Sequence, residues 1–328
     1  MTTFESVNAF PLENNDVLFF DIFYKNNEIY LISPIYNDVI DSNDIKITID
    51  NVEIKIKDKY IKEKREPIVI YVYNYSSCLE QIEAIIKYKE ITKTFILKQT
   101  ISTEPKHYLT LTTLFKNDYY LFPLFYKYYK EQGVSHFYMY YNGKITPEII
   151  KVFSYNDVTL IEWDYRYWNN KDEYLYTHHA QLGQMHHCIY KYGKESCDYM
   201  IFCDLDEYLY VPKQNIKNFI LNNKEIDTFG FRNRWSQTIN NKIPETFQNV
   251  FLTSDAIWYG NRSKNIFKID SVKTISIHIG NEFFNVPKSI NDLTMFHFYN
   301  WTNKNRKITD LSFAIIDTTN FLYNDIYV

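Results

Sequence analysis

The stretch Tyr108-Leu-Thr-Leu-Thr-Thr-Leu-Phe115 is a continuous run of apolar and β-branched residues, which predicts a buried strand. Working outward from it, Lys116-Asn117-Asp118 is a polar break, and residues 120–132 follow as a predicted helix with Gly133 as its C-cap. Residues 134–141 form a second apolar run that ends at Asn142-Gly143. This part of the chain therefore predicts strand, helix and strand in succession.

The same alternation continues toward residue 203. Pro147 opens a further helix, residues 158–163 read as a third strand, and residues 174–192 read as a long helix. Residues 198–203 are the fourth strand. Such alternation predicts an α/β fold in which a mixed, mostly parallel sheet is flanked by helices, and ligands bind at the carboxyl ends of its strands.

The chain before residue 106 has a different pattern. Residues 17–100 contain short β-branched and aromatic runs broken by Asn and Asp turns, and Asp50-Asn51 is placed to join two antiparallel strands. We therefore expect a smaller β-rich, sandwich-like domain over residues 1–105 and the α/β domain over residues 106–328.

Composition excludes some classes of protein. The 328 residues carry a formal net charge of −4 and no long block of Lys and Arg, which argues against a nucleic-acid partner. The four cysteines form no Cys-x-x-Cys pair and are expected to be reduced thiols. Neither a signal peptide nor an apolar run long enough for a membrane span is apparent, so a cytoplasmic protein is expected. Oligomeric state cannot be read from this sequence.

The clearest chemical motif is Asp204-Leu205-Asp206, which directly follows the fourth strand. On an extended backbone, side chains at i and i+2 face the same side, so the two carboxylates would repel each other unless a cation lies between them. Mg²⁺ or Mn²⁺ bound to a diphosphate would remove this repulsion. Glu207 would face the other side, where an ion pair, a capping role or a functional role are all open.

Two groups of histidines need separate treatment. His278 and His297 lie singly in apolar strands, where each could complete a metal shell or bind phosphate, although a lone strand histidine is more often a core residue. His178-His179 and His186-His187 resemble a metal box, but eight residues of helix separate them by about 12 Å. We interpret these pairs as helix-surface or interface residues.

Several short segments, in this order, resemble the family 92 glycosyltransferases, also known as the domain-of-unknown-function-23 group. The resemblance covers about residues 106–305. The matching segments are Lys116-Asn117-Asp118 with Tyr120-Leu121, Gly133-Val134, Tyr141-Asn142, Gln181 with Cys188, Asp204-Leu-Asp-Glu-Tyr-Leu209, Trp235, Pro244-Glu245-Thr-Phe247, Lys264-Asn-Ile-Phe-Lys268, His278 and His297-Phe-Tyr299. The ordered set is more specific than any one segment, and it favours His278 and His297 as site residues.

The resemblance implies a GT-A fold and transfer of a sugar from a nucleoside-diphosphate donor, most simply a UDP-sugar, to a hydroxyl of a glycan or glycoconjugate, with inversion. It implies a Mn²⁺ or Mg²⁺ ion. The residues expected to bind the nucleotide-sugar are Lys116, Asn117, Asp118, Asn142, Gln181, Asp204 and Lys264. The residues expected to bind the metal are Asp204, Asp206, His278 and His297. For the catalytic base, Glu245 is the first choice and Asp255 the second.

The chain also departs from the family pattern. Asp118 replaces a glutamate, Pro123 and Tyr129 stand where an acid and a histidine are usual, and Ser236-Gln-Thr-Ile239 replaces a Phe-Gly segment. Many members carry a membrane anchor, which is not apparent here. These differences bear on the donor sugar and the acceptor more than on the reaction.

Two other functions are open at this point. Clustered acids at strand ends also occur in metal-dependent phosphohydrolases and nucleotidyltransferases, although a chain with 7 glycines and no glycine-rich loop is a poor match for the latter. An inactive transferase fold that binds carbohydrate is the second alternative.

Overall fold

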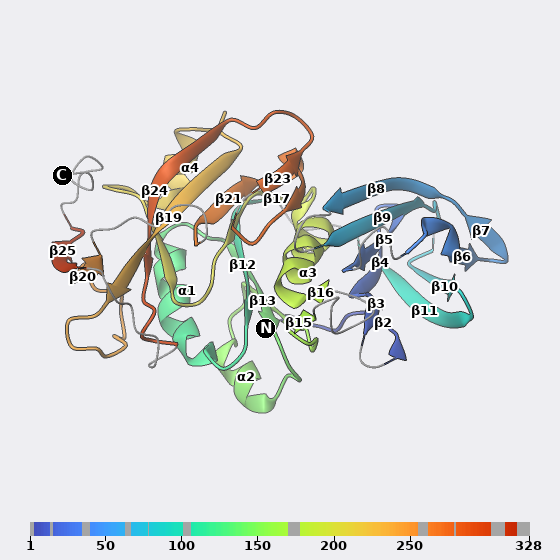
Figure 1. Cartoon of the computed structure of the whole chain (residues 1–328), viewed down its shortest axis with the longest axis horizontal. Helices are drawn as coiled ribbons and strands as arrows, with labels where there is room; N and C mark the ends of the chain where they lie inside the picture. The colour runs from blue at the N-terminus through green and yellow to red at the C-terminus, as the bar shows by residue number, and fades with distance from the viewer. Residues whose placement is uncertain are drawn as a thin grey trace.

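The computed structural model contains two large β-sheets with a short helix, α3 (Ala180–His187), between them (Figure 1). Together they make a mixed α/β protein, as the sequence predicts. The residues that the structure describes are 3–13, 16–34, 40–62, 67–77, 79–100, 106–169, 178–254, 262–278, 280–302 and 312–319.

The larger sheet has eleven strands and is half parallel and half antiparallel. Its main path is β1 (Thr3–Glu5), β14 (Val158–Glu162), β13 (His136–Tyr141), β12 (His107–Phe115), β17 (Cys197–Phe202), β21 (Lys264–Lys268), β19 (Thr228–Gln237), β20 (Val250–Ser254) and β25 (Phe313–Asp317). Off this path, β24 (Ser289–His297) pairs with β19 and with β18 (Glu207–Tyr210).

Strand direction changes at β17. The strands from β1 to β17 pair in parallel, as the strand-helix alternation predicts. Beyond β17 the neighbours along the main path are antiparallel. The expectation of a mostly parallel sheet therefore applies to one half, because after residue 203 the chain returns through hairpin-like strands instead of crossover helices.

The helices follow local capping signals. A 3₁₀ turn (Tyr119–Leu121) precedes α1 (Phe122–Glu131), in which Pro123 occupies the first turn, where its missing N–H costs little. Gly133 has φ +91°, the left-handed conformation expected after a helix end. Thr146 caps α2 (Pro147–Val152), and Asn215 caps α4 (Ile216–Leu221).

The predicted long helix at residues 174–192 is wrong at its start. β16 (His178–His179) is extended and pairs with β15 (Trp168–Asn169), so α3 begins only at Ala180. After His187 the helix continues as a π-helix (Cys188–Gly193). Cross-strand pairing of residues 9 and 11 positions apart overrides the helical pattern there.

The smaller sheet has eight strands in residues 21–100. Their order is β7 (Val52–Ile54), β6 (Ile45–Ile49), β10 (Gln81–Tyr88), β11 (Ile91–Thr100), β4 (Asp21–Lys25), β5 (Glu28–Ser33), β9 (Ile68–Asn74) and β8 (Ile56–Lys62). The Asp50-Asn51 turn joins β6 and β7 as predicted, with φ of 50° and 62°. Both halves of this sheet contribute to one core, which includes Ile47, Ile86, Leu31 and Tyr71.

Three further strand pairs and two 3₁₀ turns complete the described elements. They are β2 (Phe10–Pro11) with β3 (Val17–Phe19), β15 with β16, β22 (Val272–Ile275) with β23 (Gly280–Phe283), and the turns Ser42–Asp44 and Ile269–Ser271. Because β1, from the N-terminal region, pairs with β14 in the larger sheet, the division at residues 105 and 106 stays a prediction.

Alternation along β4 attaches the smaller sheet to α3. Ile22 and Tyr24 face the core of the smaller sheet, whereas Asp21, Phe23 and Lys25 face the helix side. At Gly183 of α3, an added Cβ would lie 2.2 Å from the ring of Phe20, so this contact requires glycine. The helix therefore belongs to the core that lies between the two sheets.

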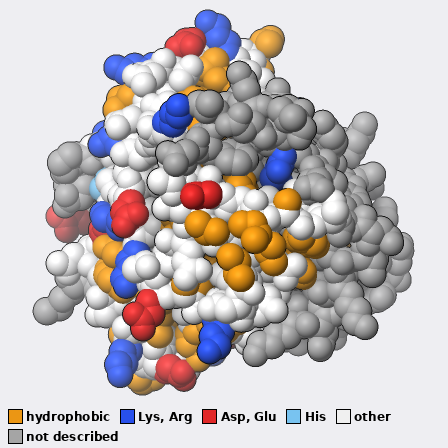
Figure 2. All heavy atoms as spheres, turned by 90° about the vertical axis from the view of Figure 1, so that its left-hand side faces the viewer, with side chains coloured by type: hydrophobic (Ala, Val, Ile, Leu, Met, Phe, Trp, Pro, Cys, Tyr) orange, Lys and Arg blue, Asp and Glu red, His pale blue; other side chains and the backbone are white. Residues whose placement is uncertain are grey.

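The surface near β20 and β25, at one end of the larger sheet, carries apolar side chains. Figure 2 shows the end of the molecule that lies at the left of Figure 1, where hydrophobic side chains gather among scattered charged ones. Val250 of β20 and Ile315 of β25 are among the exposed aliphatic residues.

None of the described helices has both the length and the apolar character needed to cross a membrane. Cys188, Cys197 and Cys203 are free and buried, and Cys78 lies outside the described residues.

Candidate active site

A cavity of about 230 Å³ lies at the carboxyl ends of β12 and β17, where the sequence predicts a ligand site. We call it the acidic cavity. Its described lining consists of Leu114, Asp118, Tyr167, Gln181, Asp204, Asp206, Arg262, His297 and Thr302. Three carboxylates from two neighbouring strand ends therefore face one space, together with one arginine and one histidine.

Asp204 and Asp206 reach this cavity through a turn. The strand β17 ends at Phe202, and Leu205 and Asp206 form a turn in which Glu207 N–H donates to the Asp204 carbonyl at 3.1 Å. The two acids are therefore not side by side on an extended strand, as the sequence argument assumed. Both nevertheless line the same cavity, because the turn directs both toward it.

The acids belong to an alternating chain of charges. Lys264 Nζ lies 2.8 Å from Asp204 Oδ2 and 3.3 Å from Glu207 Oε2, and His297 lies 3.6 Å from Glu207 Oε1 and 3.3 Å from Asp206 Oδ2. The chain thus runs Asp204, Lys264, Glu207, His297, Asp206. The repulsion between Asp204 and Asp206 is reduced by two basic side chains of the protein, Lys264 and His297.

These contacts set the ionisation of the buried members. Burial acts to raise the pKa of Asp206, but the charge of His297 and a hydrogen bond from Thr302 hold it below its ordinary value. Burial acts to lower the pKa of His297, and Asp206 outweighs it, so this pKa is raised. Burial raises the pKa of Glu207 to about 7 against the opposing charge of Lys264. The pKa shifts of Asp206 and His297 have one cause, the close contact between these two side chains.

Glu207 holds the turn in place. Its Oε2 accepts the Asp204 backbone N–H at 2.7 Å, and the side chain is buried against Lys264. Of the roles left open for Glu207, the structure shows the ion pair and the capping contact. His297 lies directly opposite Glu207 in the β18–β24 pairing and opposite Trp235 in the β19–β24 pairing, and its Nε2 lies 3.3 Å from Asp206 Oδ2.

Asp118 is the third acid of the cavity. Its Oδ1 accepts the Lys116 backbone N–H at 3.0 Å, which folds the loop after β12 back on itself. Burial raises the pKa of Asp118 to about 6, and the negative charges of Asp206 and Asp204 act in the same direction. The ionisation of Asp118 therefore depends on the charges of the other two carboxylates in this cavity.

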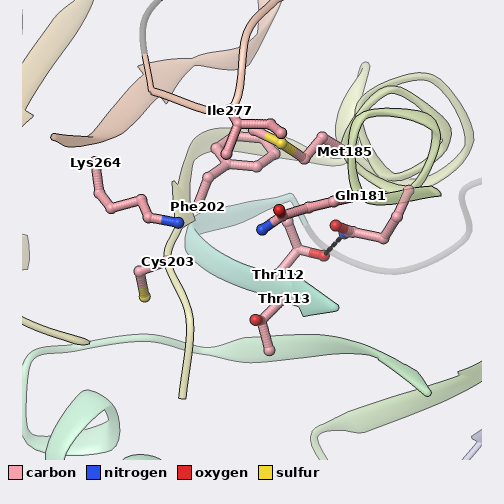
Figure 3. A pocket seen from close by; sticks show the side chains of 9 residues that line it. Thr112, Thr113, Gln181, Met185, Phe202, Cys203, Lys264 and Ile277 are labelled. Atoms are coloured by element: carbon pink, nitrogen blue, oxygen red, sulfur yellow. Dashed lines mark hydrogen bonds between the residues drawn. The ribbon is translucent and has the colours of Figure 1, made fainter. Parts of the chain in front are cut away.

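Gln181 connects α3 to Asp204. Its Nε2 donates to Asp204 Oδ1 at 3.0 Å, and its Oε1 accepts from the Tyr167 hydroxyl at 2.9 Å. Behind it lies a second cavity of about 10 Å³, roughly one water molecule in size. Figure 3 shows Gln181 and Lys264 extending toward this small cavity from opposite sides, above Thr112 and Thr113. Asp204 is thus held from two sides by polar side chains.

Besides Leu114, three lining residues were not identified from the sequence as site residues. Arg262 lies with its guanidinium 5.8 Å from the centre of the Trp235 ring, and that ring packs 4.6 Å from His297. Thr302 donates to Asp206 Oδ2 at 2.8 Å. Tyr167 follows β14. The lone Arg and Tyr in loops carry no spacing signal, so only the arrangement of strands brings them to the acids.

The other predicted nucleotide contacts are distributed differently. Lys116 and Asn117 are exposed next to Asp118, and neither lines the described cavity. Asn142 is buried, and its amide donates to the carbonyls of Trp163 at 3.0 Å and Tyr165 at 2.7 Å. Its N–H groups therefore hold the chain after β14 rather than facing the cavity.

The remaining predicted residues are not part of the described cavity lining or lie outside the described residues. His278 is half-buried, and its Nδ1 lies 3.0 Å from the Ser263 carbonyl; burial lowers its pKa, with Lys264 acting in the same direction. Glu245 is exposed, is not part of the described cavity lining, and meets Lys127 through its backbone carbonyl. Asp255 lies outside the described residues.

The two histidines of the second pair, His186 and His187, bond to protein groups. His186 and His187 are completely buried, so they are not surface residues of the helix. His186 Nε2 accepts the Ile275 backbone N–H at 3.0 Å, and His187 Nε2 lies 2.7 Å from Asp21 Oδ2. His187 is thus an interface residue between the two sheets. The side chain of His178 lies outside the described residues.

The residue types of the acidic cavity fit a divalent cation. Carboxylates from Asp118, Asp204 and Asp206, with the imidazole of His297, form the kind of donor set that Mn²⁺ or Mg²⁺ takes. Within the described ranges no three acidic, His or Cys side chains are already gathered around one point. Lys264 and His297 contact Asp204 and Asp206 in this structure, so a bound ion would displace Lys264 from Asp204 and would take His297 in its neutral form.

Comparison with known proteins agrees with the site. A model of glycosyltransferase family 92 matches residues 106–321, which include the acidic cavity. The fold and site thus belong to a sugar-transferring enzyme, which favours a transferase over a phosphohydrolase or nucleotidyltransferase. The chain is a member of glycosyltransferase family 92. A comparison with curated proteins gave no match.

Proposed function

We propose that this enzyme transfers a sugar from a nucleoside-diphosphate donor, most simply a UDP-sugar, to a hydroxyl of a glycan or glycoconjugate acceptor. The observation that carries the proposal is the convergence of Asp118, Asp204 and Asp206 with Arg262 and His297 on one cavity at parallel strand ends. The parallel half of the sheet, β14-β13-β12-β17, is the arrangement expected of a GT-A domain, which we assign from residue 106 onward.

We assign Mn²⁺ or Mg²⁺ to Asp204 and Asp206, with His297 as a further ligand; bound there, the ion would act as a Lewis acid toward the departing diphosphate. His278 is the weaker candidate ligand, because its Nδ1 already lies against the Ser263 carbonyl. Gln181 and Lys264 orient the Asp204 carboxylate from two sides. Arg262 places a positive charge on the same cavity and would contact the diphosphate directly.

Lys116, Asn117 and Asp118 lie at the end of β12 and are assigned to the nucleotide end of the donor. Asn142 would act by holding the neighbouring backbone, because its amide bonds the carbonyls of Trp163 and Tyr165. Inversion requires a base that accepts the proton of the acceptor hydroxyl. Glu245 is our first assignment for that base on the family resemblance, although it lies outside the described cavity lining, and Asp255 is the second.

The direct test is a panel of nucleotide-sugars incubated with the full chain, an acceptor glycan and Mn²⁺. We expect release of the nucleoside diphosphate that requires the acceptor, is lost with EDTA and returns with added Mn²⁺. A thermal shift by one donor in the presence of Mn²⁺ alone would identify the nucleotide. Release of a monophosphate without acceptor would contradict the proposal, and activity that persists in EDTA would remove the metal from it.

A further inference from the structure

An aromatic ring borders the acidic cavity on the side of Asp204. Tyr167 is 50% exposed, whereas the largest aromatic side chains of the chain are mostly buried in its cores. The rest of the described lining is carboxylate, amide, guanidinium, imidazole, hydroxyl and one leucine. Tyr167 therefore gives the cavity its one described benzene-type face.

The structure holds this ring at three points. The Tyr167 hydroxyl donates to Gln181 Oε1 at 2.9 Å, and the Tyr167 carbonyl accepts the Ala180 N–H at 2.9 Å. Its ring meets the buried His179 ring edge-on, with centroids 4.9 Å apart at 65°. A ring fixed in this way loses little conformational entropy when a ligand packs against it.

Hydrogen bonds and ion pairs divide lining side chains of the acidic cavity into two groups. Tyr167, Gln181 and Asp204 are joined in one hydrogen-bonded series, and Asp206, His297 and Thr302 form another. Asp204 and Asp206 both lie in the turn after β17, whereas their partners come from opposite sides of β12 in Figure 1, from β15 and α3 for Asp204 and from β24 and the turn after it for Asp206. A nucleoside-diphosphate sugar also has two chemically different ends, with the diphosphate between them.

Assigning the two ends of the donor to the two sides of the acidic cavity gives one orientation of the bound donor. If the diphosphate lies at Asp204 and Asp206, the flat nucleobase meets the Tyr167 ring, and the sugar hydroxyls meet the polar side chains of His297 and Thr302. Stacking of a base on an aromatic ring is favourable for any base, because every base has a π-face. The hydroxyl-rich sugar gains more from hydrogen bonds on the other side.

We propose that Tyr167 stacks on the nucleobase of the donor and, through Gln181, positions Asp204. This rests on the proposed function, and it adds the direction in which the donor lies. The ring provides affinity for the nucleoside, and the hydroxyl keeps the Gln181 amide directed at Asp204. The two roles belong to different atoms of one side chain and can be separated by substitution.

The test is calorimetric titration of the full chain with UDP, with uridine and with inorganic pyrophosphate, each in the presence of Mn²⁺. Tyr167→Leu removes both the ring and the hydroxyl, so the ring is judged against Tyr167→Phe: we expect UDP and uridine to bind roughly 5- to 150-fold more weakly to the Leu variant than to the Phe variant, with equal pyrophosphate binding by the two. Tyr167→Phe keeps the ring, so UDP affinity should change much less while kcat falls. Trp168→Leu is the matched control, because Trp168 is a neighbouring exposed aromatic residue outside the described lining.

The thermal midpoint of each variant shows whether it is folded. Unchanged UDP affinity in a folded Tyr167→Leu protein would overturn the stacking, as would an effect confined to the KM for the acceptor. An unchanged kcat in Tyr167→Phe would overturn the positioning role. Wild-type protein that binds no nucleoside diphosphate at all would instead remove the proposed function, so the two failures are distinguishable.

Discussion

Two clusters of buried charge lie on the two sides of α3, and they differ in their access to a cavity. One contains Asp204, Lys264, Glu207, His297 and Asp206 and borders the acidic cavity. The other contains Asp21, His187 and Lys191, with Glu5 at its edge, and lines neither of the two cavities described above.

The chemical make-up of the two clusters is similar. Each joins acids to one histidine and one lysine, and each shifts pKa values: the charges of Lys191 and His187 overcome burial to lower the pKa of Asp21 to about 2. In the Asp21 cluster the partners satisfy one another, and Tyr140 donates to or accepts from His187 Nδ1 at 2.7 Å. A perturbed pKa therefore indicates a functional site here only where a cavity gives a ligand access.

The largest effect is expected on transfer activity, from substitutions in the cluster that borders the acidic cavity. In the double variant Asp204→Asn with Asp206→Asn, we expect transfer to fall roughly 10³- to 10⁴-fold, because the carboxylates that would hold the ion and diphosphate are gone. Steady-state release of the nucleoside diphosphate measures this. Asp198→Asn, at the other end of β17 and paired with Lys106, is the control and should keep its rate. A double variant with wild-type kinetics would contradict the site.

The second largest effect is expected on stability and not on activity, from a substitution in the Asp21 cluster. Lys191→Met leaves Asp21 buried without its ammonium partner, so the free energy of unfolding should fall by about 3–5 kcal/mol. Urea unfolding measures the loss. Lys273→Met breaks an exposed pair with Glu282 and should cost less than about 1 kcal/mol. If the folded fraction of Lys191→Met bound UDP less tightly than wild type, the separation of the two clusters would be wrong.

A pH series tests the same cluster with a smaller expected effect. The folded pKa of Asp21, about 2, lies below its ordinary value of 3.8, so its contribution is present above pH 4 and is lost as the pH falls toward 2. From this shift we expect a contribution of about 2 kcal/mol. Burial lowers the pKa of His187, so protonation of the unfolded chain below about pH 6.5 also reduces stability.

Denaturant unfolding of wild type and Asp21→Asn at a series of pH values checks this prediction. The difference in unfolding free energy between the two proteins should narrow as the pH falls from 5 toward 2. A difference that stays constant over that range would show that Asp21 is not ionised in the folded protein.

The smallest expected effect concerns the helix between the clusters. Gly183→Ala would usually stabilise a helix, but here its Cβ would lie 2.2 Å from the buried Phe20 ring, so we expect a loss of about 1–2 kcal/mol. Thermal unfolding measures it. Adding Phe20→Leu to Gly183→Ala should recover part of the loss relative to Phe20→Leu alone; no recovery would mean that the ring is not the obstacle.

Sequence patterns predicted those elements that local residues determine. The strand before Lys116, the Gly133 helix end, the Pro147 helix and the Asp50-Asn51 turn depend on neighbouring residues, and the structure confirms them. The start of α3 was wrong, because it depends on pairing between β15 and β16. Antiparallel pairing beyond β17 was missed for the same reason, since it joins segments distant in the chain.

The residues of the candidate site fall into the same two groups, those that the sequence predicts and those that depend on how distant segments assemble. Asp204 and Asp206 are adjacent in sequence and are recognisable as a motif, and Lys264 and His297 follow from the order of the family segments. Tyr167, Arg262 and Thr302 come from separate loops with no periodic or spacing signal, so only the assembled strands reveal them. Asp21 was not identified as a buried ion-pair partner, because within residues 17–24 it looks like a polar residue in a strand.

The close contact between Phe20 and Gly183 also limits how the enzyme can be divided. The family segment begins at residue 106, yet a fragment cut there would lose the side chains that cover the rear of α3 and the carboxylate that neutralises Lys191. Gln181, which holds Asp204, belongs to that same helix. Recombining this transferase with another N-terminal module would therefore require transplanting the β3–β4 segment along with the catalytic portion.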